Sequence, residues 1–111
     1  MKLALLLMTV LLAPSLFAQE TICGRTYGFA YNQDSIERPY RLSGFWIKQN
    51  TQDVRITYGN SPELIEAVEQ LKGSIFICID EYTLVTKKYA EKPRLYAIVS
   101  KYRIWVDGEE L

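Results

Sequence analysis

The sequence predicts a mainly β domain, a small β-barrel of five strands with one helix between the third and fourth strands. Three observations favour this class. Apolar and polar residues alternate in five separate segments, as they do in strands that bury one face. One segment near the middle of the chain has helical spacing instead. The chain also contains eight tyrosines, four phenylalanines and two tryptophans, residue types that favour strands and cores.

The first three predicted strands lie in the first half of the domain. Arg25–Tyr31 alternates and carries Gly28 at its centre, where a glycine usually marks a bulge or a bend. The next segment, Asn32–Tyr40, is polar, contains a proline and is predicted to be a loop. Two further strands, Leu42–Lys48 and Val54–Tyr58, are separated by a short polar turn and form a predicted hairpin.

Helical spacing begins after Ser61, a residue type favoured at the N-cap of a helix. Pro62 follows at the first helical position, where its missing amide costs nothing. Gly73 suits the left-handed conformation that ends many helices. The pattern predicts a helix over Pro62–Lys72, with its apolar stripe against the core and its glutamates in solvent.

Alternation resumes after the helix. Ser74–Asp80 is predicted to be a strand with three isoleucines on one face. A lysine-rich segment, Thr83–Arg94, is predicted to be a loop, Leu95–Trp105 the last long strand and Asp107–Leu111 a polar tail. No repeat or internal linker divides the chain, so we expect a single domain.

Residues 1–18 have the pattern of a secretory signal peptide. Lys2 provides a basic start, Leu3–Leu12 is almost continuously apolar, and the small residue Ala18 precedes a polar pair. The apolar run is about ten residues, half of what a bilayer-spanning helix needs, which disfavours the alternative of a membrane anchor. We therefore expect bacterial export to a secreted or periplasmic location. The mature chain would be one domain over residues 19–111, without a transmembrane segment.

Cys23 and Cys78 are the only two cysteines, and their wide spacing excludes a CxxC redox motif or a zinc knuckle. In an oxidising compartment an even number of cysteines favours a structural disulfide. The alternative, lipid attachment at Cys23, would need a small preceding residue, and Ile22 stands there. A disulfide closing so long a loop would stabilise the fold by about 4 kcal/mol in the chain-entropy model.

Charge and residue content disfavour several function classes. Basic and acidic side chains both number 13, and this neutrality argues against general nucleic-acid binding. The chain has no histidine, the commonest general base and metal ligand, and no glycine-rich phosphate loop or catalytic serine motif. Asp80 and Glu81 are adjacent carboxylates, but neighbouring strand residues point to opposite faces. We expect no enzyme activity, no cofactor and no metal.

Five strands with a helix between the third and the fourth is the element order of the OB-fold, a five-stranded Greek-key barrel. The chain resembles this fold over nearly all of residues 19–111, and its plan is similar to that of small secreted bacterial OB-fold proteins. The resemblance is architectural and includes no family signature. It implies that the first and fourth strands are neighbours, which would bring Cys23, just before the first strand, close to Cys78. Another small α+β arrangement is the alternative.

The resemblance also implies a binding surface across the second and third strands and the loops beside them. Strand alternation places Trp46 and Lys48 on the outer face, opposite Phe45 and Ile47, and places Arg55 outward on the next strand. The candidate ligand-binding residues are Trp46, Lys48 and Arg55, with Arg38, Arg41, Lys87 and Lys88 on bordering loops.

Such an aromatic and cationic patch could hold an anionic or sugar ligand by stacking and charge. In the alternative interpretation, Trp46 only covers the barrel and the lysines keep its edge soluble. Two functions stay open. One is a non-enzymatic exported module that contacts another secreted protein or an envelope component. The other is a binder of a small ligand or oligomer on the face of the second and third strands.

Overall fold

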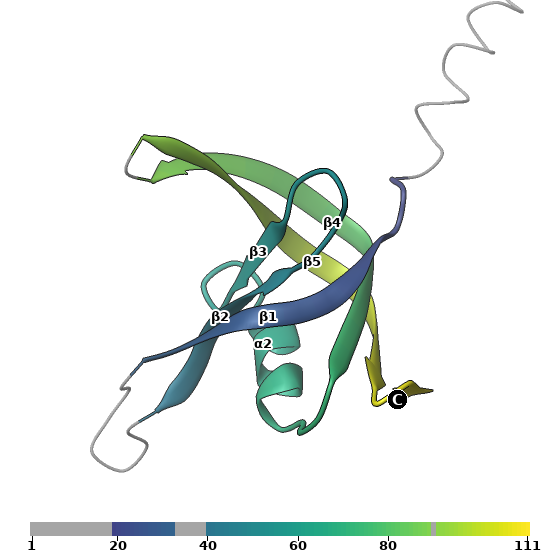
Figure 1. Cartoon of the computed structure of the whole chain (residues 1–111). Helices are drawn as coiled ribbons and strands as arrows, with labels where there is room; N and C mark the ends of the chain where they lie inside the picture. Colours follow the sequence, from purple (N-terminus) through teal and green to yellow (C-terminus); the bar gives the residue numbers. More distant parts are fainter. Residues whose placement is uncertain (1–18, 33–39, 90) are drawn as a thin grey trace, which may run out of the picture.

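The structure, a computed structural model, describes residues 19–32, 40–89 and 91–111. The predicted signal peptide (residues 1–18) and the candidate Arg38 lie outside the described residues. The described residues form six strands and one helix, whose arrangement Figure 1 shows. Their bounds are β1 Ile22–Asn32, β2 Arg41–Ile47, β3 Val54–Thr57, α2 Pro62–Glu69, β4 Ile75–Tyr89, β5 Lys92–Val106 and β6 Glu109–Glu110.

The strands form one sheet in the order β3-β2-β1-β4-β5-β6. A parallel pairing between β3 and β5 closes the first five strands into a barrel, while the other pairings are antiparallel. The predicted class is therefore confirmed: the protein is mainly β, a closed five-stranded barrel with a short helix between β3 and β4. This topology is consistent with an OB-like fold.

The core lies between the inner faces of the strands and helix α2. Phe45, Ile47, Ile56, Ile77 and Ile79 are fully buried strand residues. The three isoleucines predicted to share one face of β4 are all buried, as alternation requires. Helix α2 adds the buried residues Leu64, Ile65 and Val68.

The helix begins at Pro62 after the N-cap residue Ser61, as predicted, but it ends before Lys72 and the Ser61 side chain makes no capping hydrogen bond. The helix ends at Glu69. After it the Leu71 amide donates a hydrogen bond to the Val68 carbonyl at 3.0 Å, which forms a tighter turn. The Ser61 hydroxyl donates to the Ala97 carbonyl (3.2 Å) and accepts from the Val99 amide (3.0 Å). A serine only 2% exposed is thus used to satisfy backbone groups of β5 rather than those of its own helix.

The lysine-rich segment predicted as a loop is instead part of a long hairpin. The pairing of β4 with β5 is continuous from the pair Tyr82 and Val99 to the pair Tyr89 and Lys92. Figure 1 shows the end of this hairpin extending beyond the barrel. Both faces of this ribbon contact solvent, so its sequence lacks the one-sided burial that marks a strand. The predicted polar tail is also corrected, because Glu109 and Glu110 form the short strand β6 against Val106 and Trp105.

The disulfide prediction is confirmed. Cys23 and Cys78 are direct partners in the β1–β4 register, with a Cα–Cα distance of 4.1 Å and an S–S distance of 2.07 Å. Cys23 lies inside β1 rather than before it. The pair is consistent with an oxidising environment. Within the described residues, no helix has the length and apolar character needed to cross a membrane.

Candidate functional site

Four outward-facing residues lie in one line across the barrel. Tyr27 of β1 pairs with Trp46 of β2, Trp46 with Arg55 of β3, and Arg55 with Tyr96 of β5. We call Tyr27, Trp46, Arg55 and Tyr96 the Trp46 row. Its members come from four strands, so barrel closure positions them together.

A bulge in β1 makes room for the Trp46 ring. The β1–β2 register shifts between Tyr27 and Ala30, and Gly28 in between has φ +63°. A methyl group on Gly28 would lie 2.9 Å from Cδ1 of Trp46. The predicted irregularity at Gly28 is therefore confirmed, and glycine is required there both for its backbone angle and for the close approach of the indole.

Arg55 lies against the Trp46 ring, with its Cζ 5.3 Å from the ring centroid. Its Nη1 donates to the Gly28 carbonyl at 3.2 Å, which anchors the side chain across β2. Partial burial lowers the pKa of the Arg55 guanidinium, and the positive charge of Arg94 acts in the same direction. An arginine remains charged despite such a shift. Among the described residues Arg55 forms no ion pair.

Every aromatic ring of the Trp46 row has a cation over it. Arg94 adds a second guanidinium 5.9 Å from the Trp46 centroid. Lys48 Nζ lies 5.9 Å from the Tyr27 ring, and Lys87 Nζ lies 5.5 Å from the Tyr96 ring. Such contacts are worth about 0.5–1 kcal/mol at exposed sites. The rings therefore hold cations in place and are not bare stacking platforms.

The cations form a second line beside the Trp46 row. Lys48 lies next to Arg25, whose carbonyl accepts its amide proton at 2.9 Å, and Arg94 is the register partner of Lys87. Val54 is the register partner of Ile47 on one side and of Leu95 on the other. One residue along each strand, Asp53 therefore lies between Lys48 and Arg94. We call Arg25, Lys48, Arg94 and Lys87 the cationic row.

Asp53 is the one carboxylate placed within the cationic row. It accepts a hydrogen bond from the Tyr27 hydroxyl and another from the Gln49 amide at 3.1 Å. The bond from Tyr27, followed by that from Gln49, lowers the pKa of the Asp53 carboxyl. The same bond raises the pKa of the Tyr27 hydroxyl. Asp53 therefore stays ionised and orients Tyr27 at the end of the Trp46 row.

The structure brings together four of the residues singled out from sequence: Trp46, Lys48, Arg55 and Lys87. Lys88 is exposed and pairs with Pro93, one residue along β4 from Lys87 and therefore on the other face of the ribbon. Sequence reasoning missed four members of the two rows. These are Arg25, Tyr27, Arg94 and Tyr96.

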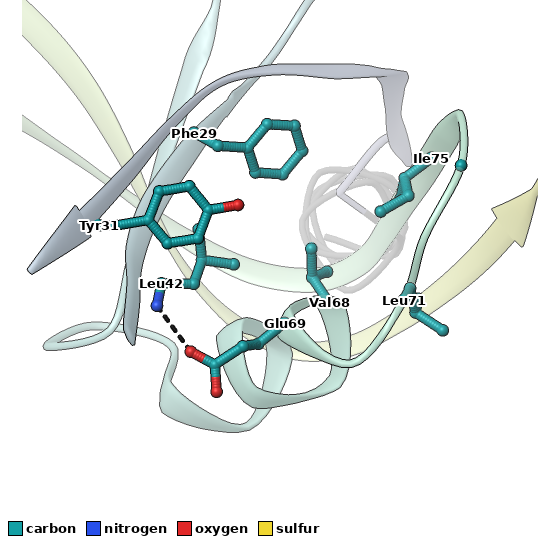
Figure 2. A pocket seen from close by; sticks show the side chains of 8 residues that line it. Phe29, Tyr31, Leu42, Val68, Glu69, Leu71 and Ile75 are labelled. Atoms are coloured by element: carbon teal, nitrogen blue, oxygen red, sulfur yellow. Dashed lines mark hydrogen bonds between the residues drawn. The ribbon is translucent and has the colours of Figure 1, made fainter. Parts of the chain in front are cut away.

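Arg41 lies at a different place, beside helix α2. Its Nη2 is 3.6 Å from Oε1 of Glu69, and the other carboxylate oxygen of Glu69 accepts the Leu42 amide at 2.6 Å. A hollow of about 160 Å³ lies between β1, β2, α2 and the start of β4. Figure 2 shows the Glu69 carboxylate at its edge, with Phe29 and Tyr31 on the opposite side. Arg41 thus helps to join β2 to the helix and is separate from the Trp46 row.

The adjacent carboxylates Asp80 and Glu81 are engaged in ion pairs. Arg103 donates to both oxygens of Asp80 at 2.8 Å, and Lys101 lies 3.4 Å from Glu81. The described part of the chain contains no group of three or more acidic, histidine or cysteine side chains arranged to hold a metal ion. Comparison with known protein families, with curated proteins and with solved structures gave no match to this chain.

Proposed function

We propose that the protein is a non-enzymatic, exported binding module that holds an anionic component of the cell envelope on the outer face of its barrel. The observation that carries this proposal is the concentration of charge on one face. Arg55 and the four cations of the cationic row surround a single carboxylate, Asp53. Because like charges repel, such a cluster is favoured where an anion binds.

The distribution of charge over the fold supports the same proposal. The chain has no formal net charge, yet five cations lie together on the face of β1, β2, β3 and the β4–β5 hairpin: Arg25, Lys48, Arg55, Lys87 and Arg94. Acidic side chains other than Asp53 are found on helix α2, at Asp80 and Glu81 of β4 and near the C-terminus. An asymmetric charge distribution steers an oppositely charged partner toward one face even when the whole protein is neutral.

The rigidity of the face is a second support. The Trp46 row spans strands of a closed barrel, and the disulfide ties β1 to β4. A face that is already ordered loses little conformational entropy when a ligand binds. The disulfide also fits a secreted or periplasmic location, since such bonds persist in oxidising compartments.

A protein partner is the second candidate, favoured by the projecting hairpin. Leu84 and Ile98 are aliphatic residues of this hairpin and are 42% and 41% exposed. They lie on opposite faces of the ribbon, because Ile98 pairs with Thr83, the residue before Leu84. A partner protein that clasps the hairpin would cover both.

In-cell photo-crosslinking from position 48 tests the proposal. A photoreactive amino acid replaces Lys48, and a matched variant carries it in place of the exposed Lys72, beyond helix α2. We expect an adduct with a non-protein anionic component from position 48 and none from position 72. A discrete protein adduct from position 48 would favour the second candidate. Equal labelling from both positions would contradict a defined binding face.

A further inference from the structure

Resting on the proposed function, we infer that the ligand is a linear acidic polysaccharide that lies across the strands and is recognised by its charge rather than by stacking. The inference names the ligand class and the direction in which it lies. Two observations carry it: the direction of the cationic row across the sheet and the cations that cover the aromatic rings beside it.

The direction of the cationic row determines the shape of the ligand. Arg25, Lys48, Arg94 and Lys87 come from four strand regions, β1, the end of β2, β5 and β4, with β3 in the middle. Neighbouring strands lie about 4.8 Å apart, so the row covers roughly 19 Å of the barrel surface. A small anion would touch one or two of these cations. An extended chain perpendicular to the strands would contact all of them.

The covered rings determine how the ligand is recognised. Nucleobases bind exposed aromatic side chains by stacking on a free ring face. Here Lys48, Arg55, Arg94 and Lys87 lie over the rings of Tyr27, Trp46 and Tyr96. A stacked base would have to displace one of these cations, although the phosphate backbone of the same nucleic acid needs that cation to neutralise its charge. The arrangement therefore favours a polymer without planar groups.

Acidic polysaccharides have the required chemistry. They carry repeated carboxylate, sulfate or phosphate groups on non-planar sugar rings. Guanidinium groups bind such anions with two parallel hydrogen bonds. Those of Arg55 and Arg94 both lie against the Trp46 ring, which limits their movement. The Tyr27 hydroxyl already donates to Asp53, so its orientation is set before a ligand arrives.

The probe for the test is a series of heparin-derived oligosaccharides from disaccharide to octasaccharide. The chain has two tryptophans, so its two indole N–H signals in NMR spectra report separately on Trp46 and Trp105. We expect the octasaccharide to shift the Trp46 signal and to leave that of Trp105 unchanged. Its affinity should exceed that of the disaccharide by at least about tenfold at low salt. It should also fall with salt with a log–log slope of about −3, as for four charges neutralised by a flexible polyanion.

Matched variants distinguish the effect of a cation's position on ligand binding from the effect of the protein's net charge. Arg94→Gln and Lys87→Gln should each weaken octasaccharide binding about fivefold and reduce the magnitude of the salt slope by about 0.7. Their controls are Arg103→Gln and Lys101→Gln, which remove the same charges from β5 at positions paired with Asp80 and Glu81. The controls should change the affinity less than about twofold.

Three results would contradict the inference in distinguishable ways. Equal affinities for the disaccharide and the octasaccharide would indicate a compact anion site and overturn the linear ligand. Tighter binding of single-stranded oligothymidylate than of the octasaccharide at equal charge and salt would indicate base stacking and a nucleic-acid ligand. The first result leaves the proposed function in place, whereas the second leaves anion binding at this face in place but overturns a cell-envelope ligand. If neither polymer shifts the Trp46 signal at low salt, the proposed function fails together with the inference.

Discussion

The two tryptophans of the chain make the same contact in two regions with opposite charge balance. Arg55 lies 5.3 Å from the centroid of Trp46, and Arg103 lies 5.4 Å from that of Trp105. Arg103 is also doubly hydrogen-bonded to Asp80, whereas Arg55 forms no ion pair among the described residues. The arginine–tryptophan contact alone therefore does not mark a binding site.

The lines of register partners through the two tryptophans differ in the same way. The line through Trp105 runs from Arg25 through Phe76 to Glu110, with the Phe76 ring edge-on to Trp105 at 5.8 Å. That line begins with a cation and ends with a carboxylate. The Trp46 row contains no carboxylate, and the cationic row beside it contains only Asp53. The arginine beside Trp105 therefore has a carboxylate partner, whereas Arg55 beside Trp46 has none among the described residues.

The largest expected effect comes from removing the covalent link between β1 and β4. In the double variant Cys23→Ser, Cys78→Ser we expect the free energy of unfolding to fall by about 4 kcal/mol, because the unfolded chain loses a long cross-linked loop. Denaturant unfolding followed by fluorescence measures it. Both tryptophan regions should unfold together. A loss below about 1 kcal/mol would show that barrel closure alone holds the strands.

A smaller loss of stability is expected at the bulge, and it should affect only the Trp46 region. Gly28→Ala places a side chain at a positive φ and against the indole, so the free energy of unfolding should fall by about 1–2 kcal/mol. The Trp46 indole signal should move and that of Trp105 should not. The control is Gly59→Ala, since a methyl group there would meet nothing within 4 Å. Equal effects of the two variants would contradict the role of Gly28.

Asp80→Asn should make the Trp105 region resemble the Trp46 region. Without the Asp80 carboxylate, Arg103 beside Trp105 loses its ion-pair partner, and Glu110 is the remaining carboxylate that acts on its charge. We expect the octasaccharide to shift the Trp105 indole signal in this variant, with an affinity at least about tenfold weaker than at Trp46, because fewer cations surround it. A Trp105 signal that stays unchanged at low salt would show that charge balance is not what separates the two regions.

The same carboxylate predicts a pH dependence. The hydrogen bonds from Arg103 lower the pKa of the Asp80 carboxyl. A lowered pKa in the folded state gives stability that is present above the ordinary aspartate pKa of about 3.9 and is lost as the pH falls through the lower, folded value. The melting temperature of Asp80→Asn should therefore lie below that of the wild type at pH 6 and approach it near pH 2. A difference in melting temperature that stays constant from pH 6 to pH 2 would contradict the stabilising role of the ionised Asp80 carboxylate.

The smallest expected effect concerns the carboxylate inside the cationic row. Asp53→Asn removes one negative charge, and its single side-chain oxygen can replace only one of the two acceptors, because Tyr27 donates to Oδ2 and Gln49 to Oδ1. The affinity for the octasaccharide should rise about two- to threefold, as expected for one exposed charge. Isothermal titration calorimetry at low salt measures the change. Weaker binding would indicate that the negative charge of Asp53 itself positions the ligand-binding side chains.

Much of the fold was predictable because local patterns carry it. Alternation located β1, β2 and β3 to within a few residues, and the change of period located the helix start. The extension of β4 and β5 was missed because a ribbon with two solvated faces has no one-sided apolar pattern. The third strand was predicted to extend to Tyr58, but β3 ends at Thr57 and Tyr58 is 45% exposed.

Sequence alone determined which side chains point outward, since strand alternation depends only on neighbouring residues. Trp46, Lys48 and Arg55 were placed together in this way. Only the tertiary structure brought Arg94 and Tyr96 beside them, because the parallel β3–β5 pairing is set by barrel closure between strands far apart in the chain. The same long-range packing turned Arg41 toward Glu69 and gave Arg103, but not Arg55, a carboxylate partner.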